Sequence, residues 1–82
     1  MDQNHKSTLL PRFLKGRSEA AYKSAEAEQN KGNLEGTKAW LLAAVAYGDA
    51  YLEFIENGDS QEVKDLTELG FQYGSRAASM YQ

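Results

Sequence analysis

Apolar residues recur in three separate segments of the chain with the three-to-four-residue spacing of an α-helix. This pattern predicts helices at about residues 10–30, 34–57 and 60–80. The glycine-containing stretches Lys31-Gly32-Asn33 and Asn57-Gly58-Asp59-Ser60 each end one helix and precede the next. No segment keeps the apolar–polar alternation of a half-buried strand. The pattern therefore predicts an all-α antiparallel three-helix bundle.

The turn Lys31-Gly32-Asn33-Leu34, with small residues inside both flanking helices, resembles that of a tetratricopeptide-like or MIT-like helical hairpin. A third helix follows this hairpin.

The middle predicted helix carries the widest apolar surface. Its apolar residues form two stripes, about 100° apart around the helix. One stripe consists of Thr37, Leu41, Ala44, Gly48, Tyr51 and Ile55, widened by Val45 and Leu52, and the other of Trp40, Ala43, Tyr47, Ala50 and Phe54. A helix with so broad an apolar arc is expected to contact neighbours on two sides and to be the central helix. Any part of the arc that two neighbours leave uncovered would be an interface.

The flanking helices have thinner apolar stripes. The first is expected to pack through Leu10, Phe13, Leu14, Ala21, Tyr22 and Ala25, and the third through Val63, Leu66, Leu69, Gly70, Tyr73, Ala77 and Met80. The aromatic residues on the stripes, Trp40, Tyr47, Tyr51, Phe54 and Tyr73, are predicted to be core residues.

The helix starts are predicted from residues that cap helices. Ser7 or Thr8 can cap a first helix that has Pro11 in its first turn, where a missing N–H costs nothing. Asp59, with Glu62 three residues later, has the spacing of a capping box for the third helix. The polar residues 1–8 are predicted to be a flexible segment, and residues 9–82 a single helical domain.

Composition narrows the class of protein. A chain of 82 residues is expected to form one domain of modest stability, and the absence of Cys excludes disulfides and thiolate zinc sites. The net charge of −3 disfavours nucleic acid as a partner, so the basic residues of the first quarter are interpreted as a solvated helix face. No apolar run is long enough to span a membrane, and the polar start does not resemble a secretory signal. The prediction is an intracellular protein without membrane insertion.

Candidate catalytic chemistry is sparse. His5 is the single histidine and lies in the polar N-terminal segment, which leaves no Ser/His/Asp or Cys/His arrangement. The inward Glu-x-x-His pattern of a helical metal site is absent from the sequence, and Gly32 and Gly36 lack the Lys-Ser/Thr of a phosphate loop. The sequence therefore predicts a non-enzymatic protein with no catalytic, cofactor-binding or metal site.

Two groups of residues are predicted to bind a protein partner. Phe71 is a large apolar residue on the polar face of the third helix, beside Lys64, Glu68 and Ser75. On the middle helix, Leu42 and Ala46 interrupt a face otherwise made of polar residues.

One family resemblance lies in the middle helix. Residues 44–59 resemble a helix of the C-terminal homology domain of the AFF family, whose members are scaffolds of the super elongation complex acting on RNA polymerase II. The matching positions are Ala44, Tyr47, Asp49, Ala50, Leu52, Phe54, Ile55, Glu56 and Gly58. This resemblance implies a nuclear scaffold domain in transcription elongation, which self-associates or holds an ELL-type factor.

A second resemblance, to MIT domains, spans all three helices. It is carried by residues 25–33 and 39–47 and by the ending Tyr73-Gly74-Ser75-Arg76-Ala77-Ala78-Ser79-Met80. MIT domains bind helical tails of ESCRT-III proteins in grooves beside the third helix, so this resemblance implies a cytoplasmic peptide receptor. A small helical chaperone or inhibitor is a third hypothesis.

Overall fold

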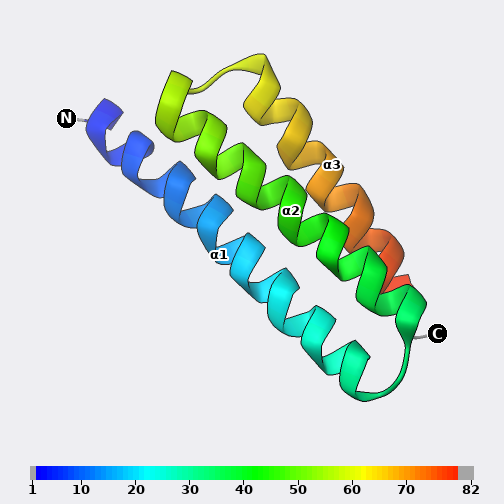
Figure 1. The fold of residues 1–82 in the computed structure, drawn as a ribbon. Coiled ribbons are helices and arrows are strands. Elements are labelled where there is room, and N and C mark those ends of the chain that lie inside the picture. Colours follow the sequence, from blue (N-terminus) through cyan, green and yellow to red (C-terminus); the bar gives the residue numbers. More distant parts are fainter. Residues whose placement is uncertain (1, 80–82) are drawn as a thin grey trace.

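The chain forms three α-helices joined by two short turns. The structure, a computed structural model, describes the backbone of residues 2–79 and the side chains of residues 9–79. The helices are α1 (Asp2–Asn30), α2 (Leu34–Asn57) and α3 (Gln61–Ser79). Each helix runs antiparallel to the one before it (Figure 1). Residues 2–79 contain no strand. The predicted all-α three-helix bundle is confirmed.

Helix α2 is the central element of the bundle. It packs against α1 on one side and against α3 on the other, whereas α1 and α3 approach each other much less closely. Figure 1 shows α2 lying between its two neighbours along an elongated molecule, whose principal extents are 46 × 20 × 19 Å. The prediction that the middle helix is contacted from two sides is therefore confirmed.

The core is built mainly from small residues. Its buried cluster comprises Leu14, Ala21, Ala43, Ala44, Tyr47, Ala50 and Val63. The alanines let the helices approach closely, and partly buried larger side chains, Leu10, Trp40, Tyr51, Phe54, Leu66 and Tyr73, pack around this cluster. The five aromatic residues predicted to pack in the core all do so.

The packing also corrects several core assignments. Four residues of the predicted core stripe of α2 are exposed, namely Leu41, Val45, Leu52 and Ile55. They point away from the arc that α1 and α3 cover. Phe13, Tyr22 and Leu69, assigned to the packing stripes of the flanking helices, are also exposed.

The turn between α1 and α2 is fixed by one buried carboxylate. Gly32 has a φ of 81°, a value that favours glycine, and Asn33 caps α2 by accepting a hydrogen bond from the Gly36 N–H at 3.1 Å. The Asn33 Nδ2 also donates to Glu28 Oε1 at 2.8 Å, and Lys31 Nζ donates to Glu28 Oε2 at 3.4 Å. Glu28 is 1% exposed, and these bonds offset the cost of burying its charge.

The turn between α2 and α3 corrects the predicted cap of the third helix. Gly58 has a φ of 78°, and its N–H donates to the Phe54 carbonyl at 2.8 Å, which closes α2. The Val63 N–H donates to Ser60 Oγ at 3.3 Å. Ser60, rather than Asp59, is therefore the N-cap, because it immediately precedes the first helical residue.

Helix α1 begins at Asp2, well before the predicted start near Leu10. The chain is helical on both sides of Pro11, so Ser7 and Thr8 lie within the helix rather than at its N-terminus. The backbone of residues 2–8 is helical, and the flexibility of the segment 1–8 stays a prediction. The side chains of these residues, including that of His5, lie outside the described part of the structure. The same is true of Met80, assigned to the stripe of the third helix.

Candidate protein-interaction surfaces

Phe71 lies where α1 and α3 approach each other. The residue before it, Gly70, is buried against the ring of Tyr47, whose atoms come within 2.8 Å of where a Cβ would stand. This contact brings Phe71 edge-on to Tyr47, with ring centroids 5.7 Å apart, and within 6.4 Å of the Phe13 ring. Phe71 stays 45% exposed, so it is half-buried in an aromatic cluster formed by all three helices.

The guanidinium of Arg17 lies against the same aromatic cluster. Its Cζ is 5.9 Å from the centroid of Phe13, 5.5 Å from that of Tyr47 and 5.7 Å from that of Phe71. Cation–π attraction at these distances favours this position for the side chain. One guanidinium nitrogen donates to the Tyr47 hydroxyl at 3.5 Å. Arg17 has no ion-pair partner among the described residues, so its other donors are available to a carboxylate.

A hollow next to Phe71 is lined by most residues of the first predicted site, which comprised Phe71, Lys64, Glu68 and Ser75. It lies between α3 and α1, has a volume of about 340 Å³, and is lined by Leu10, Asp59, Val63, Lys64, Thr67, Glu68 and Phe71. The structure thus brings Phe71, Lys64 and Glu68 together around an apolar floor. Ser75 is exposed on α3 but does not line this hollow.

A second hollow continues on the other side of Arg17. It is lined by Arg17, Ala20, Ala21, Ser24, Trp40, Tyr47 and Gly74, and has a volume of about 150 Å³. Small residues of α1 and α3 leave room above the two aromatic rings of α2. Arg17 lines this hollow and Phe71 lines the other, and the Arg17 Cζ lies 5.7 Å from the centroid of the Phe71 ring. We call the two neighbouring hollows together the α1/α3 groove.

The second predicted site, on α2, is partly wrong. Leu42 is exposed and lines a shallow apolar hollow with Lys38, Leu41 and Val45. Ala46 is only 4% exposed, because it lies on the arc of α2 that the other helices cover, so it cannot contact a partner. We call the exposed apolar residues Leu34, Leu41, Val45, Leu52 and Ile55 the α2 stripe.

Sequence reasoning missed Arg17 and Phe13 as members of a site. It placed Phe13 in the core and Arg17 on a solvated basic face. The available signal was their spacing of four residues, which puts an aromatic ring and a guanidinium on the same helix face. Their contact with Phe71 depends on tertiary packing, which local spacing does not report.

Other kinds of site are not found in the part of the chain that the structure describes. Among residues 9–79, no three His, Asp or Glu side chains are grouped so that they could hold a metal ion. Within the described residues, no helix has the length and apolarity needed to cross a membrane.

Comparisons with protein-family models, with curated proteins and with solved structures give no match for this chain. The AFF and MIT resemblances therefore rest on the residues that carry them.

Proposed function

We propose that the protein is a non-enzymatic interaction module that binds a protein segment in the α1/α3 groove. The observation that carries this proposal is the guanidinium of Arg17, set among three aromatic rings with no ion-pair partner among the described residues. Hollows lie on both sides of it. A charged donor between apolar hollows fits a segment that combines acidic and apolar side chains.

The expected ligand is a short amphipathic segment. An apolar side chain would enter the hollow beside Phe71, and a carboxylate would accept hydrogen bonds from Arg17. Lys64, which lines the same hollow, offers a second positive charge, whereas Asp59 and Glu68 on the same lining would pair with a basic side chain of the segment. Helix-in-groove recognition of this kind uses apolar anchors for affinity and charges for orientation.

The two family resemblances give this function two specific forms. If the AFF resemblance holds, the protein is a nuclear scaffold of a transcription-elongation assembly, which holds an ELL-type factor or self-associates. If the MIT resemblance holds, it is a cytoplasmic receptor for ESCRT-III helical tails. The position of the α1/α3 groove, beside the third helix, favours the MIT form.

Titration with candidate partners tests the proposal. Trp40, the only tryptophan, lines the groove, so its fluorescence should change when a segment binds there. ESCRT-III tail peptides and a purified ELL-type factor are added separately to the wild type, Arg17→Gln and Phe71→Ala. For the partner that binds, each substitution should weaken binding by about tenfold, because each removes an anchor of the groove.

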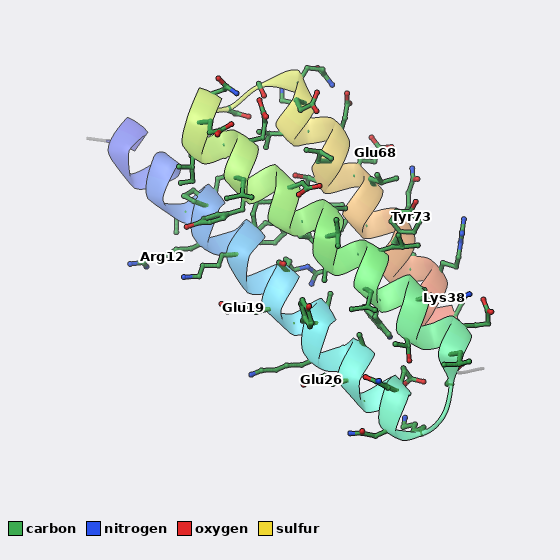
Figure 2. All side chains as sticks on the ribbon, in the orientation of Figure 1. Arg12, Glu19, Glu26, Lys38, Glu68 and Tyr73 are labelled. Carbon is green, nitrogen blue, oxygen red and sulfur yellow. The ribbon has the colours of Figure 1, made fainter. Side chains whose placement is uncertain are left out.

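Arg12→Gln is the matched control for Arg17→Gln. Arg12 lies on the same helix, and Figure 2 shows its side chain pointing away from the bundle. Its substitution changes the net charge equally but should leave affinity within about twofold. Equal losses of affinity in the two arginine variants would indicate general charge attraction. Unchanged affinity in Arg17→Gln or in Phe71→Ala would refute binding in the groove.

A further inference from the structure

The α2 stripe is a second apolar surface, separate from the α1/α3 groove. Leu34, Leu41, Val45, Leu52 and Ile55 are all between 37% and 69% exposed. They lie on the arc of α2 that neither α1 nor α3 covers, and in Figure 1 they belong to the helix between the two others. Contiguous exposed apolar residues along a whole helix are unusual for a protein that acts as a monomer.

The spacing of the α2 stripe is that of a helix that pairs with another helix. Successive positions 34, 38, 41, 45, 48, 52 and 55 are separated alternately by four and three residues. This is the heptad pattern of a two-helix seam, and five of its seven positions are Leu, Val or Ile. At position 48 a glycine lies next to Ser18 of α1, whose Oγ is 3.3 Å from where a Cβ would stand.

Two opposite charges on this face indicate the direction of a partner helix. Lys38 occupies a seam position near the N-terminal end of the stripe, and Glu56 follows the last seam position, Ile55, near its C-terminal end. They are 18 residues apart, which is about five complete helical turns, so they share one side of α2. Neither forms an ion pair with any described residue.

We propose that a second copy of this chain covers the α2 stripe, with the two α2 helices antiparallel about a twofold axis near residue 47. In this arrangement Lys38 of each copy faces Glu56 of the other, and Leu41 packs against Leu52 of the second copy. Val45 of each copy lies close to the axis. A parallel pair would instead bring both Lys38 residues to one end of the interface and both Glu56 residues to the other, so that no Lys38–Glu56 pair forms.

The dimer is expected to be weak, because one helix face makes a small interface. Dissociation constants on the order of 10–100 µM are typical of the small end of interface sizes. The proposal does not depend on the α1/α3 groove, which lies on other residues. Failure of one proposal therefore leaves the other standing, except that a strictly monomeric chain would also remove the self-associating version of the AFF form.

Sedimentation equilibrium of the full chain tests the association. Between about 5 and 500 µM, the average mass should rise from that of one chain towards that of two. Val45→Glu should weaken dimerisation by at least about tenfold, because it buries a charge near the axis next to its symmetry mate. Tyr22→Glu is the matched control, since Tyr22 is as exposed as Val45 but lies on α1 outside the stripe. This substitution should leave the dissociation constant of the dimer unchanged.

Circular dichroism of each variant checks that the helices are retained. A chain that stays monomeric up to about 500 µM would overturn the proposal. A dimer that Val45→Glu does not weaken, or that Tyr22→Glu weakens equally, would also overturn it, since association would then use another surface.

Charge reversal tests the antiparallel direction. Lys38→Glu alone and Glu56→Lys alone should each weaken the dimer several-fold, because each places like charges opposite each other. The double variant restores opposite charges in the antiparallel arrangement and should recover most of the wild-type affinity. The proposed pairing would be overturned if the single variants weakened the dimer and the double variant did not recover its affinity. It would also be overturned if neither single variant weakened the dimer.

Discussion

Gly70 shows how one residue positions the aromatic cluster at the candidate site. A side chain at this position would place its Cβ 2.8–2.9 Å from three atoms of the Tyr47 ring, closer than packed atoms can lie. A glycine inside a helix costs about 1 kcal/mol relative to alanine. Here the absence of a side chain lets α3 lie directly on Tyr47, which in turn contacts Phe71 and Arg17.

Gly70→Ala should therefore destabilise the protein in spite of alanine's better helix propensity. We expect a loss of about 1–3 kcal/mol in the free energy of unfolding, because the buried Tyr47 ring must move. Urea denaturation followed by circular dichroism measures this loss.

Gly16→Ala is the control for Gly70→Ala. No atom lies within 4 Å of the position of its Cβ on α1, so the substitution should stabilise the protein by about 0.5–1 kcal/mol. Stabilisation by Gly70→Ala of similar size would contradict the close contact with Tyr47.

At the scale of the elements, the start of α3 depends on a single serine hydroxyl. Ser60 Oγ accepts a hydrogen bond from the Val63 N–H at 3.3 Å, which satisfies one of the free donors of the first turn. Ser60→Ala should lower the free energy of unfolding by about 1 kcal/mol. Thermal or urea unfolding measures the difference from the wild type.

Asp59→Ala distinguishes this cap from the one that the capping-box pattern indicates. Asp59 precedes the cap and acts on α3 mainly through its charge near the helix N-terminus, so its removal should cost about 0.5 kcal/mol or less. A larger loss for Asp59→Ala than for Ser60→Ala would show that the hydrogen bond to Ser60 does not hold the helix start.

At the scale of the whole molecule, stability should depend on protein concentration. A chain of 82 residues has a small core, and anything that binds only the folded state stabilises it by mass action. If two copies pair through the α2 stripe, the Tm of the wild type should rise by about 4 °C between low and high micromolar concentration. Differential scanning calorimetry at several concentrations measures this shift.

Val45→Glu provides the comparison for the shift in Tm. The substitution lies on an exposed position and should leave the isolated bundle folded, but its Tm should depend on concentration much less than that of the wild type. A wild-type Tm that is also independent of concentration would contradict pairing through this helix.

Local patterns in the sequence determined the helices and most of their ends. Gly32 and Gly58 adopt the positive φ values that end α1 and α2, and these depend on residues adjacent in the chain. The width of the apolar arc on α2 identified the central helix, since helical spacing reports how much of a helix is apolar. The candidate site was only partly predictable: Phe71, Lys64 and Glu68 were named, whereas Arg17 and Phe13 were not.

Tertiary structure alone decided which apolar residues are covered. Leu41, Val45, Leu52 and Ile55 have the same spacing and composition as core residues, and the sequence could not separate them from Ala43 or Tyr47. Coverage depends on where α1 and α3 lie around α2, and that follows from packing of small residues and of Gly70 across the bundle. The apolar pattern thus determined that α2 is central, while the placement of its neighbours decided which of its faces is left for a partner.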